Sequence, residues 1–264
     1  MLIHVIADYG SGDLAFAEVA QRLKLQLPDA EPLYTPVPAF ATLVAGFCVA
    51  QLGLNAAPAG TLVYHNVAPR ADDEEARAGN EGERLAFARL PTGVRVIGVN
   101  AGYTFSFVRD ISEELRWVSV PAAGSQFRSR DLFPEALGDI VAGHPDVLDG
   151  EIPPSQIPDV PESRVAYADG YGNLKTTLGH RTLDVPSGTV VRVRIGAREV
   201  AAVASDGSFE VEEGELAFAP GSSGWPGANE RETRWMELFL RGGSAREAFG
   251  CPEVGALVEI DPDS

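Results

Sequence analysis

The chain has 264 residues, 45% of them hydrophobic, which is enough for two modest domains with ordinary cores. Its 38 acidic and 21 basic residues give a net charge of −17, which repels phosphate backbones and argues against nucleic-acid binding. Such a charge would attract a cationic small molecule, although solubility alone also accounts for it.

The sequence also argues against a membrane span and a metal site. The most apolar stretch, 40–54, is short and is interrupted by Gly and Gln. Residues 1–10 lack a cationic region and a cleavage site, so we expect no signal peptide. With only two cysteines we expect no disulfide framework and a cytoplasmic location. The four histidines lack the spacing of zinc ligands, and we expect no metal.

Strands and helices alternate along the first 150 residues. LIHVIA reads as a buried strand, and a helical pattern follows it, with Ser11 or Asp13 as its cap. The later elements are predicted as a short strand and Pro-rich loop at 31–40, a helix at 41–54, a strand at 60–69, a charged loop at 70–84, strands at 84–90 and 94–100, and a helix at 131–143. This alternation predicts an α/β domain over residues 1–150 with a mainly parallel sheet.

The composition changes after residue 150. A proline-rich segment without a helical pattern predicts a linker over residues 151–163. Residues 164–264 contain short β-rich runs separated by Gly and Pro turns. They predict a smaller, all-β, barrel-like domain.

Generic catalytic motifs are absent from the sequence, so the candidates are polar residues near strand ends. No GxGxxG, Walker-type phosphate loop, GxSxG elbow or Cys–His pair occurs. Asp8, in ADYGSGD, follows the first predicted strand, where open α/β sheets bind ligands, and a carboxylate there can accept both hydroxyls of a ribose. Asp8 and Asp13 are also typical cap or turn residues.

Three further segments have both a structural and a ligand-binding interpretation. DGYGN, at 169–173, is typical of a hairpin turn. In FRSRD, at 127–131, Ser129 is either an N-cap or part of an anion site at a helix N-terminus. In the last segment, Ser222 and Ser223 lie in a turn, and GGSA at 242–245 either begins a helix or brings backbone close to a flat ligand.

Taken in order, these segments resemble the family of enzymes that cleave S-adenosylmethionine (SAM): the SAM hydroxide adenosyltransferases, or SAM hydrolases, the chlorinase and the fluorinase. ADYGSGD resembles the family's (T/S)DxGxxD, and YADGYGNLKTT its D-x-FGN-x-x-TN. FRSRD is similar to F-(H/Y)-(G/S)-R-(D/E), and SSGW with GGSA is similar to the C-terminal S-x-G and GSA region. The resemblance spans nearly the whole chain.

The resemblance implies an α/β domain followed by a small β-barrel, in a homotrimer that binds SAM between subunits. The implied reaction is an in-line displacement at the 5′ carbon of SAM that expels methionine. SAM is the substrate and no cofactor is implied, because the sulfonium already makes methionine a good leaving group. The protein would align a partly desolvated nucleophile with the C–S bond.

The resemblance also implies roles for single residues. Asp8 matches the acid that holds the ribose hydroxyls, Asp169 the acid that meets the methionine ammonium, and Asn173 the neighbouring ligand-binding amide. The remaining matches are Tyr171 for the ring that stacks on adenine, Phe40 and Phe127 for rings beside the ribose and adenosine, Ser222 and Ser223 for the turn at the methionine carboxylate, and Arg241, Gly242 and Gly243 for backbone at the adenine edge. Asp13 completes the first motif.

The catalytic positions depart from the family pattern. Ala68 stands where the hydrolases have an Asp, and Arg128 replaces their His. Ser129 coincides with a fluorinase Ser, but the Tyr and Thr of the halide pocket would be Ala68 and Ala71. Arg70 or Arg77 stands in for the hydrolase Arg only if the loop aligns there. Arg128 beside Ser129 either forms an anion pocket or turns outward into a salt bridge.

Three hypotheses follow from the sequence. The first is SAM cleavage to adenosine and methionine with water or hydroxide, in which Arg128 and Ser129 are the candidate catalytic residues. The second is a SAM- or adenosine-binding protein that has lost turnover, and the third, ranked lowest, is halide-dependent cleavage.

Asp8→Ala tests the ribose assignment. We expect the variant to bind adenosine more weakly by about 2–3 kcal/mol, because ribose hydroxyls buried without their acceptor are costly. Titration calorimetry measures the change, and an unchanged affinity would remove Asp8 from the site.

Overall fold

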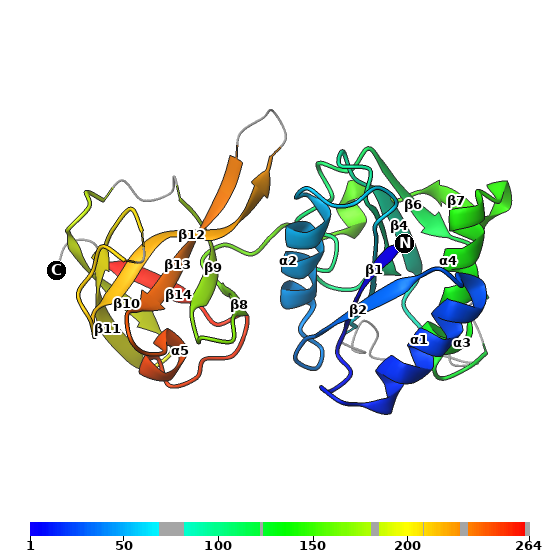
Figure 1. Cartoon of the computed structure of the whole chain (residues 1–264). Coiled ribbons are helices and arrows are strands. Elements are labelled where there is room, and N and C mark those ends of the chain that lie inside the picture. The colour runs from blue at the N-terminus through cyan, green and yellow to red at the C-terminus, as the bar shows by residue number, and fades with distance from the viewer. Residues whose placement is uncertain (69–81, 122–123, 181–184, 208, 228–231, 262–264) are drawn as a thin grey trace. The chain divides into compact units, whose positions relative to one another are not determined.

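A computed structural model describes residues 1–68, 82–121, 124–180, 185–207, 209–227 and 232–261. The chain forms two compact units, Met1–Asp159 and Val160–Ser264. Each unit is built on one seven-stranded sheet (Figure 1). The boundary falls inside the segment predicted as a linker, where Ile152 and Ile157 are buried.

The sheet of the first unit has the strand order β2-β1-β3-β5-β4-β6-β7. Three strand pairs are parallel, β1 with β2, β1 with β3, and β3 with β5. Three pairs are antiparallel, β4 with β5, β4 with β6, and β6 with β7. The strands are β1 (Leu2–Ala7), β2 (Glu31–Pro36), β3 (Leu62–Asn66), β4 (Leu85–Arg89), β5 (Arg95–Val99), β6 (Glu114–Val118) and β7 (Leu148–Glu151).

The predicted fold class, an α/β domain with a mainly parallel sheet plus an all-β barrel-like domain, is therefore wrong. Both units contain mixed sheets. The segment between β4 and β5 turns within 90–94, where Leu90 N donates to Val94 O, and so short a connection joins only antiparallel strands. The strands β6 and β7 were not predicted, and they extend the antiparallel half.

Helices lie on both faces of the first sheet (Figure 1). On one face α1 (Leu14–Gln26) and α4 (Phe133–Ala142), with the short α3 (Arg128–Asp131) before it, pack on side chains such as Val5, Tyr64 and Phe87. The other face carries α2 (Thr42–Gly53), which is buried along most of its length. Such a helix is apolar on all sides, so the sequence shows no amphipathic stripe there.

The sheet of the second unit has the strand order β14-β10-β11-β12-β13-β9-β8. Its pairs are antiparallel except β11 with β12. An isolated antiparallel bridge from Arg164 to Leu257 links the ends of the two edge strands. The strands are β8 (Val165–Ala168), β9 (Leu174–Gly179), β10 (Val190–Ile195), β11 (Arg198–Ala204), β12 (Leu216–Pro226), β13 (Glu232–Leu240) and β14 (Val258–Asp261), and the one α-helix among the described residues of this unit is α5 (Ala245–Ala248).

Within the described segments, no helix is both long and apolar enough to cross a membrane.

His65 is an unusual member of the first unit's core. It lies on β3, is fully buried, and neither ring nitrogen has a hydrogen-bond partner among the described residues. Its ring contacts Phe105 at 5.0 Å between centroids and lies against Gly98 on β5, where a Cβ would sit 2.2 Å from Nε2. Burial without a counter-charge lowers the pKa of His65 to about 3, so the ring is neutral at neutral pH.

His65 predicts a specific loss of stability in acid. Below pH 6.5 the unfolded chain binds a proton at this ring, while the folded chain does not until the pH nears 3. The free energy of unfolding should therefore decrease as the pH is lowered through this window. At pH 4.5 the decrease relative to neutral pH should be about 2–3 kcal/mol.

Urea unfolding at pH 7 and pH 4.5 tests this expectation against His65→Leu, which keeps the volume and removes the titration. The variant should lose less stability than the parent between the two pH values. Equal losses in both proteins would show that His65 does not titrate as its burial requires.

Candidate functional site

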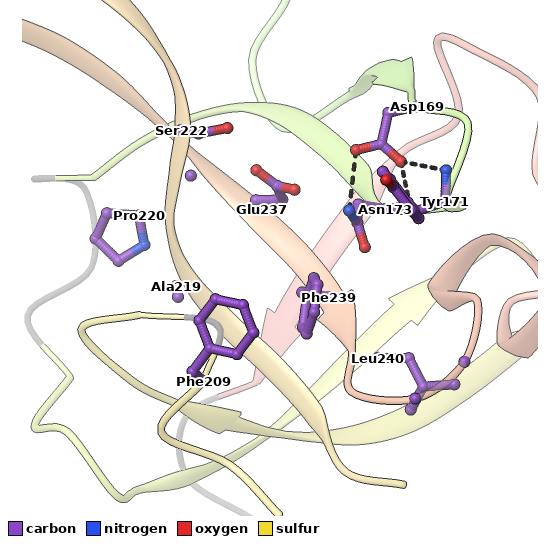
Figure 2. Close-up of a pocket in the computed structure, with 13 residues that line it drawn as sticks. Asp169, Tyr171, Asn173, Phe209, Ala219, Pro220, Ser222, Glu237, Phe239 and Leu240 are labelled. Atoms are coloured by element: carbon purple, nitrogen blue, oxygen red, sulfur yellow. Dashed lines mark hydrogen bonds between the residues drawn. The ribbon is translucent and has the colours of Figure 1, made fainter. Parts of the chain in front are cut away.

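A pocket of about 560 Å³ opens on the second unit, within the size range of small-molecule sites. Four regions distant in sequence form it: the loop from β8 to β9, the connection from β11 to β12 that carries Phe209, the irregular middle of β12, and the end of β13 with the turn after it (Figure 2). Its lining residues are Asp169, Tyr171, Asn173, Phe209, Ala219, Pro220, Gly221, Ser222, Glu237, Phe239, Leu240, Gly242 and Gly243.

The Asp169 carboxylate holds the loop between β8 and β9 in shape. Its Oδ1 accepts hydrogen bonds from the backbone N–H of Tyr171 at 2.9 Å and of Asn173 at 3.0 Å. Its Oδ2 accepts from Nδ2 of Asn173 at 2.9 Å. The hairpin is closed by Asp169 N donating to the carbonyl of Asn173 at 3.1 Å. The segment is thus a tight turn whose first acid organises the turn's own backbone.

The amide of Asn173 has one satisfied end and one unsatisfied end. A carboxylate only accepts hydrogen bonds, so the amide nitrogen must face Asp169, and this fixes the amide orientation. The carbonyl oxygen, Oδ1, then lies on the side away from Asp169 (Figure 2). Asn173 is only 7% exposed, and Oδ1 is buried with no hydrogen-bond partner in the described structure. Because a buried acceptor without a donor is costly, Oδ1 is the pocket's strongest indication of a ligand.

A cross-strand ion pair lies beside Asp169. Lys175 on β9 is paired in register with Glu237 on β13. The Lys175 ammonium lies 3.0 Å from Oε2 of Glu237 and 3.9 Å from Oδ2 of Asp169. Both side chains of the Lys175–Glu237 pair are largely buried, with 10% and 12% exposed.

The opposite wall of the pocket is apolar and aromatic. Phe209 and Phe239 lie with ring centroids 6.0 Å apart, and Leu240 also lines the pocket (Figure 2). Phe209 is 80% exposed and Tyr171 is 84% exposed, although large aromatic side chains are usually buried. Apolar and aromatic walls next to a few directed polar groups are typical of sites for small organic ligands.

Several predicted site residues meet in this pocket, and others do not. The predicted residues that line it are Asp169, Tyr171, Asn173, Ser222, Gly242 and Gly243. Ser223 is buried beside it, and Arg241 donates from Nη1 to the carbonyl of Val211 at 2.6 Å; neither lines the pocket.

Sequence reasoning missed Glu237, Phe209 and Phe239. Glu237 belongs to a β-rich run whose partner strand the sequence does not reveal.

The predicted residues of the first unit gather near the end of β1. Asp8 Oδ2 accepts a hydrogen bond from the backbone N–H of Phe40 at 3.0 Å. Phe40 has a φ of 62°, a left-handed conformation unusual for a phenylalanine, and its side chain is 52% exposed. Asp8 therefore stabilises a strained turn before α2. Asp13 caps α1, since its Oδ1 accepts from Ala15 N at 2.8 Å.

Ser129 is buried within a hydroxyl cluster rather than capping a helix. Its Oγ lies 2.6 Å from the Tyr9 hydroxyl, and its carbonyl accepts from the Tyr64 hydroxyl at 2.8 Å. Burial raises the pKa of Tyr64 well above its usual value, so Tyr64 keeps the proton that it donates. Phe127 packs edge-on against Tyr9, with centroids 5.8 Å apart.

Two backbone carbonyls hold the guanidinium of Arg128 in place. Its guanidinium donates to the carbonyls of Glu83 at 3.1 Å and Pro121 at 3.2 Å, and it lies 5.2 Å from the centre of the Phe133 ring. Ala68 is partly buried and packs against the apolar core of this unit. Arg70, Ala71 and Arg77, also considered from the sequence, lie outside the described residues.

Comparisons with known proteins identify the fold and no activity. No protein-family model and no curated protein matches the chain. A solved structure described as an uncharacterized conserved protein from Thermotoga maritima is similar, with a TM-score of 0.76, 20% identity, and 98% of this chain and 99% of that one covered. A conserved hypothetical protein from Thermus thermophilus has a TM-score of 0.67 and 23% identity, with 98% of each chain covered. Both show that this two-unit fold occurs elsewhere.

Two glycines in the Asp169 loop allow a matched test of its rigidity. Gly172 has a φ of +84°, and a Cβ there would lie 2.1 Å from Oγ of Ser244, whereas a Cβ on Gly170 meets nothing within 4 Å. Gly172→Ala should lower the free energy of unfolding by about 1–3 kcal/mol, and Gly170→Ala by less than about 0.5 kcal/mol.

Chemical denaturation of both variants measures this difference. Equal effects of the two substitutions would mean that the loop adapts freely and does not hold Asn173 in a fixed position.

Proposed function

We propose that the chain binds SAM through its adenine ring in the second unit's pocket and cleaves it to adenosine and methionine. The unsatisfied Oδ1 of Asn173 is the observation that carries this proposal. Adenine has an exocyclic amine that donates hydrogen bonds, and a flat ring that packs on aromatic side chains. The pocket offers a complementary acceptor beside the rings of Phe209 and Phe239.

The charge of the pocket also supports a cationic ligand. Two carboxylates, of Asp169 and Glu237, line it, and no basic residue is among its described lining residues. Lys175, which is not among the lining residues, lies 3.0 Å from Glu237 and 3.9 Å from Asp169 and offsets one negative charge. SAM carries a positive sulfonium, so its binding gains from this balance and from the chain's net charge of −17.

The reaction proposed is a displacement that needs no added oxidant or reductant. A water oxygen bonds to the 5′ carbon of SAM, the C5′–S bond breaks, and its electron pair leaves on sulfur as neutral methionine. The attacking water loses one proton to solvent, so SAM and water give adenosine, methionine and a proton. The protein's contribution is alignment of the water with the C–S bond.

A second candidate function is binding without turnover. Ala68 supports it, because this methyl group packs on the core at the position where the resemblance implies an acid. Ser129 is also buried and already bonded to Tyr9. Halide-dependent cleavage ranks third, since the methyl side chain of Ala68 cannot donate a hydrogen bond to a halide.

The homotrimer with sites between subunits, and the cytoplasmic location, stay predictions from the sequence.

Incubation of the protein with SAM, with and without chloride or fluoride, followed by chromatography of the nucleosides, separates the three functions. We expect adenosine in halide-free buffer. A 5′-halo-adenosine would favour the third function, and SAM binding without product would favour the second. The absence of both SAM binding and product would contradict the proposal as a whole.

Asn173→Leu tests the role of the unsatisfied oxygen. The parent protein should bind adenosine more tightly than inosine, which has a carbonyl in place of the amine. In the variant the ratio of adenosine affinity to inosine affinity should fall by a factor of about 10 to 100, because no acceptor is left for the amine.

Titration calorimetry with both nucleosides gives the ratio of their affinities, and general damage to the fold weakens both alike. A preference for adenosine that survives in Asn173→Leu would remove Oδ1 from adenine recognition.

A further inference from the structure

We infer that Glu237, with its charge balanced by Lys175, makes the pocket select a ligand carrying a positive charge over its neutral analogue. This inference rests on the proposed SAM site and names the residues that would set its charge preference. SAM and S-adenosylhomocysteine form the natural pair for such a preference, because they differ by one methyl group and the positive charge on sulfur.

The Lys175–Glu237 pair is built into the pocket wall. The two residues face each other in register across β9 and β13, so the strand pairing itself brings ammonium and carboxylate together. The ammonium lies 3.0 Å from Glu237 and 3.9 Å from Asp169. One buried cation therefore lies between two carboxylates, and the three groups keep a net charge of −1.

Only the negative side of this group reaches the cavity. Asp169 and Glu237 line the pocket, whereas Lys175 does not. A ligand therefore meets the carboxylates directly and the ammonium only through them. The adjoining Asn173 oxygen, also buried and unpartnered among the described residues, marks the same cavity as a place for a ligand.

Glu237 is held in place by close backbone. The register of β12 with β13 shifts between Pro220 and Gly224, a β-bulge that brings Gly221 against Glu237. A Cβ on Gly221 would lie 2.5 Å from Oε2 of Glu237 and 3.2 Å from the carbonyl of Trp235. The carboxylate is thus fixed between Lys175 and the bulge, and its charge interacts with a ligand in a largely buried, poorly screened position.

The two members of the pair predict opposite changes in selectivity. Glu237→Gln removes the negative charge and keeps the shape, so the ratio of SAM affinity to S-adenosylhomocysteine affinity should fall by about tenfold. Lys175→Met removes the positive charge and keeps an apolar stem of similar length, so the same ratio should rise above that of the parent protein.

The affinities of both nucleosides are measured by calorimetry for the parent and for each variant. Glu199→Gln is the matched control, because it removes a carboxylate of the same unit that pairs with Arg192 on the surface and lies outside the pocket. The control should leave the ratio unchanged. If the pair had a purely structural role, both substitutions would weaken the binding of SAM and of S-adenosylhomocysteine alike. The affinity ratio would then not change in opposite directions in the two variants.

The outcomes separate this inference from the proposed function. Binding of both nucleosides with the same ratio in the parent and in Glu237→Gln overturns the inference and leaves the adenosine pocket intact. Failure of the parent to bind either nucleoside overturns the proposed function and the inference with it.

Discussion

The candidate site depends on the hydrogen bond from the Asn173 amide to Oδ2 of Asp169. The Asp169 carboxylate uses its other oxygen to accept from two backbone N–H groups of the same turn, so the acid, the turn and the amide form one rigid unit. The amide nitrogen is fixed to the carboxylate, and its oxygen is left in a buried position without a donor among the described residues. A protein keeps such an acceptor at a cost in stability, and a ligand donor removes the cost.

The sheet of the second unit brings the other parts of the pocket to this turn. The bulge in β12 places Gly221 beside Glu237, and the pairing of β13 with β9 places Glu237 opposite Lys175. Phe209 and Phe239, in edge contact with each other, complete an aromatic wall. The pocket therefore joins a single unpaired acceptor, an aromatic surface and an excess negative charge, a combination that suits a cationic nucleoside better than an anionic one.

Local chemistry was predictable from the sequence, whereas long-range pairing was not. The turn at Asp169 and the cap at Asp13 were both indicated, because each depends on residues a few positions apart. Glu237 was missed, since its place beside Lys175 depends on the pairing of two strands, and the two residues are 62 positions apart in the sequence. The parallel sheet was wrongly predicted because the alternation of early elements was extended to β4, which a short turn joins to β5 in antiparallel pairing, and because β6 and β7, both paired antiparallel, were not recognised. Ser129 was placed at a helix start but not in contact with Tyr9, a contact between residues 120 positions apart.

A structure determined from crystals of the protein that have been soaked with SAM tests the central claim most directly. We predict that the adenine ring lies against the aromatic wall, with its exocyclic amine about 2.7–3.2 Å from Oδ1 of Asn173. A nucleoside bound elsewhere, with this pocket empty and Oδ1 still without a donor, would contradict the account.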